Sequence, residues 1–378
     1  MNINTEMTTA RPADNHDISM VLDRVKNTRK EDWACPRNQV RLNWNADARQ
    51  YRVTLGGQHE FNTNEHFQSQ VASKSVNTKG VPGMVAYSRY LNETNQQELL
   101  VDNVNRQLDR SEETAFIRTV GNEEPTARAF LSNKYKAIDD DDVFLPAVEI
   151  IGDHADKFRT LGGQRTDVRT CLKFITRDKI CSVGNRDLFA GFQLTNSEVG
   201  MGSAKYSAFL FDEFCENGCV FGSIDLFQVN FVHRGAKLNT KFGQVFGDEF
   251  RAAEIASIRA AIAEATLRAL DDSYHAKIAD IIETGEKRKI TGHVPTVIEE
   301  VGKRVGLTEQ ERIDTLAHWN SSEDNAFGLQ AAITEVAQES SSFNRRSELE
   351  KAGGEVIELS DSLCNAVSAL QAPTKKKK

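Results

Sequence analysis

Alternation of apolar and charged residues predicts a β-strand in the middle of the chain, over residues 167–183. Successive side chains of a strand point to opposite faces, so the two parities of this stretch describe two surfaces. The parities are Val168, Thr170, Leu172, Phe174 and Thr176 against Arg169, Cys171, Lys173, Ile175 and Arg177. The pattern therefore predicts a strand with an apolar face and a cationic face.

The same alternation continues on both sides of this strand. Further strands are expected over residues 188–194 and 206–214, a hairpin over 39–57, and strands over 114–120 and 127–132. Spacing of three and four residues predicts helices instead. These cover residues 18–30, 62–73, 84–108 as two helices, 143–151, 246–282, 294–319 as two short helices, 324–338 and 355–370.

These elements predict an α+β fold, in which helices back a curved antiparallel sheet and a helical C-terminal region follows. The expected division is a disordered N-terminus over residues 1–17, an α+β core over 18–245, a helical region over 246–371 and a basic tail over 372–378. Thr308 and Glu311 fit a capping box for the second of the two short helices. A DNA-binding helix-turn-helix is less favoured there than a structural helical hairpin, because the pair carries several glutamates.

Charge sets the central stretch apart from the rest of the chain. Eight cations and two acids give residues 157–186 a charge of +6, whereas the whole chain carries −8. A groove that follows phosphates is one interpretation. A solvated strand face whose charges prevent edge pairing is the alternative. The candidate nucleic-acid-binding residues are Arg159, Arg165, Arg169, Lys173, Arg177 and Lys179.

Composition places the chain among ordinary water-soluble proteins. It has 378 residues, with 39% hydrophobic and 27% charged, and no apolar run approaches the length of a membrane span. The N-terminus lacks the basic start and apolar run of a secretory signal, and six cysteines in so long a chain do not suggest a disulfide scaffold. A cytoplasmic location is therefore expected, and the net charge argues against simple coating of duplex DNA.

Enzyme motifs are weak in this sequence. The acids 139–142 precede an apolar helix, where they offset the helix dipole without a metal. Cys171, Cys181, Cys215 and Cys219 lack the spacing of common zinc knuckles, and no partner can be named for Ser197 as a nucleophile. No phosphate-binding loop of an ATP motor is present. We therefore assign no catalytic residue, no metal and no cofactor.

Several short phrases together resemble a family of phage- and plasmid-encoded proteins that is defined by a domain of unknown function, number nine-three-two. The phrases are RAFLSNKY at 128–135, NSEVG at 196–200, CENG at 215–218, NAFG at 325–328 and the segment 346–354. The resemblance covers most of residues 39–354 and implies a gene carried on a phage or plasmid. It assigns no chemistry, and Ser197 and Glu198 of the second phrase are expected to form a turn.

Three functions follow from this sequence. The first is a protein that binds and anneals single-stranded DNA as a homo-oligomer, a ring or filament, in recombination or replication. By analogy, annealing proteins similar to RecT, Red-beta and the Rad-type annealers combine a twisted sheet, a long helix and a cationic groove. The second is a phage structural or host-interaction protein without a nucleic-acid role. The third is a metal-dependent enzyme that uses the cysteines or the acids 139–142.

Overall fold

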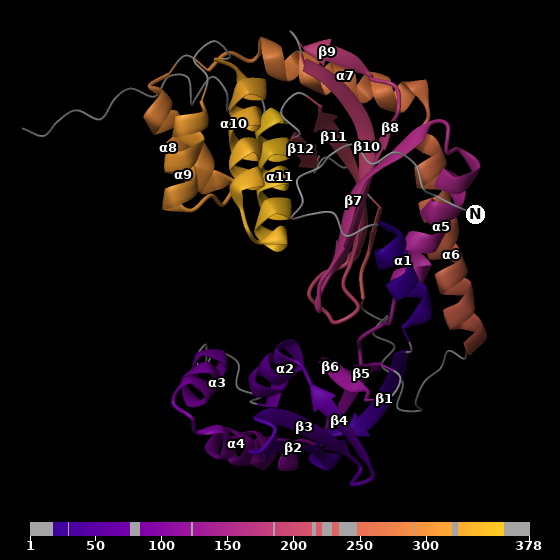
Figure 1. The fold of residues 1–378 in the computed structure, drawn as a ribbon, viewed down its shortest axis with the longest axis vertical. Helices are drawn as coiled ribbons and strands as arrows, with labels where there is room; N and C mark the ends of the chain where they lie inside the picture. Colours follow the sequence, from indigo (N-terminus) through magenta and orange to yellow (C-terminus); the bar gives the residue numbers. More distant parts are fainter. Residues whose placement is uncertain are drawn as a thin grey trace, which may run out of the picture.

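The computed structural model shows a chain that folds around two separate β-sheets (Figure 1). The described residues contain thirteen strands and eleven α-helices, and none of these helices is both long and apolar enough to cross a lipid bilayer. The described residues are 18–28, 30–75, 84–121, 124–183, 186–213, 217–220, 229–233, 248–290, 292–319 and 324–358.

The first sheet has the strand order β1-β5-β6-β4-β3-β2. Its pairs are antiparallel except for β4 and β6, which run parallel. Its elements are β1 (Lys30–Pro36), β2 (Val40–Asn45), β3 (Gln50–Leu55), β4 (His59–Thr63), α2 (Glu65–Ser75), α3 (Met84–Glu93), α4 (Gln97–Asp109), β5 (Thr114–Val120) and β6 (Thr126–Ser132). Helix residues such as Phe67 and Val104 share one core with Val53 and Ile117 of the strands. The sheet is therefore stabilised by its own hydrophobic core.

The second sheet is antiparallel, with the path β12-β11-β10-β8-β7 and short strands β9 and β13 at its margin. Its strands are β7 (Phe158–Arg165), β8 (Thr170–Thr176), β9 (Cys181–Val183), β10 (Arg186–Asn196), β11 (Ala204–Asp212), β12 (Asn217–Val220) and β13 (Val229–Phe231). The helices in its core are α1 (Ile18–Asn27), α5 (Asp140–Asp153), α6 (Asp248–Arg268) and α7 (Asp272–Lys287). Leu172 and Phe174, the predicted apolar parity of β8, lie fully buried in this core.

The C-terminal helices form a third hydrophobic core. They are α8 (Val294–Arg304), α9 (Glu309–His318), α10 (Ala326–Glu339) and α11 (Phe343–Ile357). The capping box of Thr308 and Glu311 is present at the start of α9. Helix α11 lies beside β12, and its Glu350 pairs with Lys173 on the predicted cationic face of β8. That face is therefore covered by a helix where Lys173 stands.

The mixed α and β composition and the helical C-terminal region are confirmed, while several boundaries differ from prediction. The single predicted sheet is two sheets, and β4 precedes the predicted helix at residues 62–73. The predicted helix at 246–282 is two helices, because the chain is extended at Asp271 between α6 and α7. Both belong to the core of the second sheet rather than to a separate helical region. Gly285 lies inside α7, where it packs against Ile357.

Helix α11 continues through Gly353 and Gly354, which were expected to precede the last helix. A Cβ atom at Gly353 would lie 2.7 Å from Cγ2 of Thr334, so the missing side chain allows α10 and α11 to approach closely. Residues 359–370 of the predicted last helix lie outside the described residues. The same holds for the two predicted disordered termini and for Cys215.

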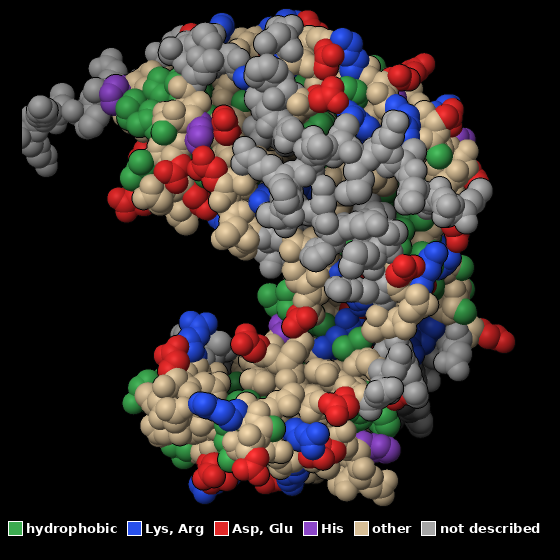
Figure 2. All heavy atoms as spheres, viewed as in Figure 1, with side chains coloured by type: hydrophobic (Ala, Val, Ile, Leu, Met, Phe, Trp, Pro, Cys, Tyr) green, Lys and Arg blue, Asp and Glu red, His purple; other side chains and the backbone are tan. Residues whose placement is uncertain are grey.

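A hollow separates the C-terminal helices from the helices of the first sheet (Figure 2). Figure 1 shows α9 and α11 on one side of it and α2 and α3 on the other, with the turns of the second sheet at its inner end. We call this hollow the cleft. Its inner end is where the two sheets meet, and the functional analysis therefore concentrates there.

Replacing Gly191 by alanine tests the packing of the second sheet. A Cβ atom there would lie 2.1 Å from the Phe174 carbonyl oxygen on the neighbouring strand, so we expect a loss of about 1–3 kcal/mol in unfolding free energy. Gly152→Ala in α5 is the matched control. No atom lies within 4 Å of its would-be Cβ, so this change should stabilise the helix by about 0.5–1 kcal/mol. Urea denaturation measures both, and equal stabilities would contradict this packing.

Candidate anion-binding site at the junction of the two sheets

The six predicted phosphate ligands do not share one open surface. Four of them are paired with carboxylates. Lys173 lies 2.6 Å from Glu350, Arg159 2.9 Å from Glu213, Lys179 2.8 Å from Asp187 and Arg165 3.6 Å from Asp140. The remaining two donate to backbone carbonyls, Arg169 to Met201 and Arg177 to Ala155. A continuous phosphate track along β8 is therefore absent from the described surface, and only part of the set remains available for a ligand.

Lys173 and Arg159 show why alternation alone did not identify this face. The Glu350 side chain that holds Lys173 is 2% exposed, and the Lys173 ammonium also lies 5.2 Å from the centre of the Phe209 ring. The Arg159 guanidinium lies 4.6 Å from the centre of the Phe189 ring. Both cations therefore pack against aromatic rings on the same face of the sheet. Cation–π attraction stabilises them in these positions.

Glu198, in the turn between β10 and β11, is the centre of a buried charge cluster. Its carboxylate accepts from Arg128 and from the backbone N–H of Asp140, and it lies 2.8 Å from the ammonium of Lys30. Arg165 approaches it at 3.7 Å. The Glu198 side chain is 2% exposed. Arg128 and Lys30 come from the first sheet and Glu198 from the second, so these pairs join the two sheets.

Arg118 on β5 extends the cluster. Its guanidinium donates to Asp32 at 2.8 Å, to Asp139 at 2.5 Å and to the backbone carbonyl of Glu198 at 3.2 Å. The side chain is 1% exposed, so each of these acceptors replaces water that the charge has lost. Asp32 lies two residues after Lys30, so both side chains are on the same side of β1.

Asp140, the first residue of α5, is the fully buried acid of the cluster. It accepts hydrogen bonds from Thr170 at 2.7 Å and from the Asn196 side chain at 2.9 Å. His233 contacts the Asn196 oxygen at 3.0 Å and stacks on Tyr135 at a centroid distance of 5.2 Å. The polar groups of the junction are thus connected from α5 through β10 to the Tyr135 ring.

Burial and neighbouring charges shift the pKa values of Asp140 and Glu198 in opposite directions. Burial and the neighbouring Glu198 raise the pKa of Asp140 to about 6. Burial alone would also raise the pKa of Glu198, but the cations Arg128, Lys30 and Arg118 hold it well below its ordinary range. Glu198 therefore carries the fixed negative charge of the cluster, and Asp140 is the group that titrates near neutral pH.

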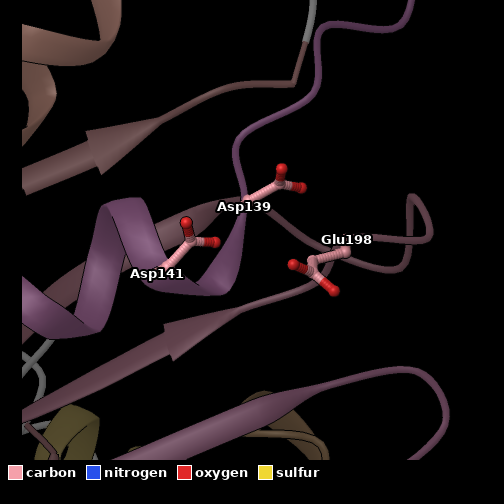
Figure 3. A group of neighbouring side chains, drawn as sticks. All are labelled: Asp139, Asp141 and Glu198. Carbon is pink, nitrogen blue, oxygen red and sulfur yellow. The ribbon is translucent and has the colours of Figure 1, made fainter. Parts of the chain in front are cut away.

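Three carboxylates of the cluster lie close enough together to be compared with a metal site (Figure 3). They are Asp139, Asp141 and Glu198, whose oxygens lie within 4.8 Å of one another. Each is already bound by a cation, Asp139 by Arg118 and the other two by Lys30. A divalent ion would have to displace buried ion pairs, so the residues fit a charge-balanced junction better than a metal centre. Cys215, one of the four cysteines whose spacing did not favour zinc, lies outside the described residues.

A cavity of about 560 Å³ opens beside this cluster, and we call it the junction cavity. It is lined by Lys74, Leu131, Ser132, Lys134, Tyr135, Gly200, Gly202, Ser203, Val232 and His233. The described lining thus holds two lysines, a histidine and several hydroxyls, and it holds no carboxylate. In a chain with a net charge of −8, such a lining favours an anionic ligand.

Lys74, at the end of α2, is the most perturbed cation of the cavity. Burial and the nearby Arg37 lower its pKa to about 8, and its ammonium donates to the Phe130 carbonyl at 2.7 Å. An anion beside Lys74 would favour the charged ammonium and relieve this unfavourable burial. Burial likewise lowers the pKa of Lys205, together with the positive charges of Lys351 and Arg169. Cations therefore gather on the second sheet as well.

The sequence analysis missed most of this site. Lys30, Arg118 and Arg128 were not considered as site residues. Glu198 does lie in the expected turn, where Ser197 accepts from the Met201 N–H at 2.9 Å and Gly200 adopts a positive φ of 81°, but the buried ion pairs of the Glu198 carboxylate were not predicted. The signal that could have found the junction was the resemblance itself, since two of its phrases, RAFLSNKY and NSEVG, supply Arg128, Tyr135 and Glu198.

Comparison with known proteins adds no relative. No protein-family model, curated protein or solved structure matches the chain.

Glu198→Gln tests whether the cluster holds the two sheets together. Removing the charge leaves Arg128 and Lys30 buried without their common partner, so we expect a loss of about 3–5 kcal/mol in unfolding free energy. Glu264→Gln is the matched control, because Glu264 pairs with Arg268 at the surface and should cost about 1 kcal/mol or less. Denaturant titration checks both, and a Glu198 variant as stable as the control would contradict the role of the cluster.

Asp140→Asn should change how stability depends on pH. The folded chain holds the Asp140 proton more tightly than the unfolded chain, since the folded pKa is raised to about 6. Asp140 therefore stabilises the fold below its ordinary pKa, and this contribution is lost as the pH rises through about 6. Between pH 4 and 7 the stability of the variant should rise relative to the wild type by on the order of 2 kcal/mol. Parallel stability curves would show that Asp140 titrates normally.

Proposed function

We propose that the chain binds single-stranded nucleic acid along the cleft and holds its phosphates at the junction cavity. The observation that carries this proposal is the lining of the cavity, with Lys74, Lys134 and His233 and no carboxylate among its described residues. Phosphate is the anion that suits such a set, because lysine ammonium groups and hydroxyls both bind its oxygens.

The neighbouring surface supports a strand rather than an isolated phosphate. Arg169 donates to the carbonyl of Met201, in the turn whose glycines line the cavity, and it lies near Lys205. Arg169 is thus the one predicted phosphate ligand that keeps this role in the proposal. Cations on the first sheet and on the second sheet would hold successive phosphates of one backbone.

Apolar groups beside the cavity favour unpaired bases. Met201 is 52% exposed and Val232 is 59% exposed, so both offer surface to a base. Tyr135 does not serve as a stacking platform in this proposal, because Phe116 and His233 already contact its ring. A duplex would keep its bases turned inward and gain little from these side chains. Strand annealing, self-association and an origin on a phage or plasmid stay predictions of the sequence.

Measuring the affinity for a labelled oligothymidylate against salt concentration tests the proposal. Each lost phosphate contact on a single strand flattens the slope of log affinity against log salt by about 0.7. Lys74→Gln with Lys134→Gln should therefore weaken binding and flatten the slope by about 1.4. The loss should be equal for other base sequences, since phosphate contacts do not distinguish bases.

Lys179→Gln with Lys303→Gln is the matched control, because it removes two surface lysines that do not line the cavity. This variant should keep most of the affinity and the slope. Lys173 is unsuitable for the test, since its removal would leave Glu350 buried without a partner. Unchanged affinity and slope in a folded Lys74/Lys134 variant would overturn the proposal.

A further inference from the structure

A second cavity, of about 350 Å³, lies on the first sheet and has the opposite character. It is lined by Glu31, Trp33, Gln58, His59, Glu60, Phe61, Thr119, Gly121 and Pro125, and we call it the aromatic cavity. The described lining contains two carboxylates and three rings, of which Trp33 contacts the other two, and it contains no lysine or arginine. It shares no residue with the junction cavity.

The strand lengths explain why this cavity exists. β6 begins at Thr126, opposite Asn62 of β4, so the preceding residues of β4 have no partner on β6. Gly121, directly after β5, has a φ of 114° that suits glycine. The space beside His59 and Phe61 is therefore not filled by a strand.

Alternation along β1 brings Trp33 into this space. Lys30 and Asp32 point toward the charge cluster at the junction, so Glu31 and Trp33 lie on the opposite side of the strand. The Trp33 ring lies 4.5 Å from the His59 ring and 5.5 Å from the Phe61 ring, measured between centroids. The indole Nε1 is buried and has no hydrogen-bond partner within the described part of the chain.

Rings and carboxylates together favour a particular ligand. The face of an aromatic ring attracts an organic cation, and tryptophan does so most strongly. Glu60 adds negative charge, and its pairing with Arg52 at 3.2 Å involves two partly exposed side chains, which makes that pair weak.

We propose that the aromatic cavity binds a small organic ammonium ion. The alkylammonium group would lie against the rings of Trp33 and Phe61, with Glu60 near its charge. This site is independent of the proposed strand binding, because the two cavities attract ligands of opposite charge.

Choline and 3,3-dimethyl-1-butanol separate charge recognition from simple hydrophobic binding, because the alcohol has the same shape and hydroxyl but no charge. Tryptophan fluorescence reports binding, since Trp33 lies in the cavity. We expect choline to bind with a dissociation constant of about 1 mM and at least about fivefold more tightly than the alcohol. Glu60→Gln should reduce this preference without affecting the fold.

The tryptophan variants localise the signal. The fluorescence response to choline should disappear in Trp33→Phe and persist in Trp44→Phe, whose indole contacts Tyr51 elsewhere on the sheet. Calorimetric titration of the same variants checks that binding itself, and not only the signal, depends on Trp33. Equal affinity for choline and the alcohol, no binding at about 10 mM, or an unchanged response in Trp33→Phe would each overturn the proposal.

Discussion

The ion pairs around Glu198 are the interaction on which the arrangement of the two sheets depends. Each sheet has a hydrophobic core of its own, and the apolar cluster that links them is small: Ala129 and Leu131 of β6 pack with Val199 of the turn between β10 and β11. Glu198 and Asp139 from the second sheet and its helix meet Lys30, Arg118 and Arg128 from the first. Separating the sheets would break all of these pairs together, whereas removing one partner alone would leave the other charges buried and unpaired, which is costly.

The same junction creates the proposed ligand site. The turn that carries Glu198 continues into Gly200 and Gly202, which line the junction cavity together with Lys74 and Lys134. The carboxylates of the cluster already form ion pairs with its lysine and arginine residues. The lysines that line the cavity, in contrast, have no carboxylate among the described lining residues. A chain with a net charge of −8 thus has a cavity whose described lining holds two lysines and no carboxylate.

Local elements could be predicted from the sequence because their causes are local. The hairpin at β2 and β3, the strands β10 and β11 and the capping box at Thr308 all follow from short-range periodicity or capping. Whether the predicted cationic face is exposed depends on contacts between residues that lie far apart in the sequence. Lys173 meets Glu350 across 177 positions, and alternation identifies a face without saying what covers it. Arg165 was likewise expected to face phosphate, yet it approaches Asp140 and Glu198.

Acetylation of lysines in the presence and absence of an oligothymidylate strand tests the central claim most directly. Mass spectrometry reads the acetylation of each lysine separately, so it locates the strand without substituting any residue. The account predicts that the strand binds and protects Lys74 and Lys134 from acetylation, while the surface residue Lys179 reacts equally in both samples. A bound strand that leaves Lys74 and Lys134 as reactive as in the free protein would contradict it.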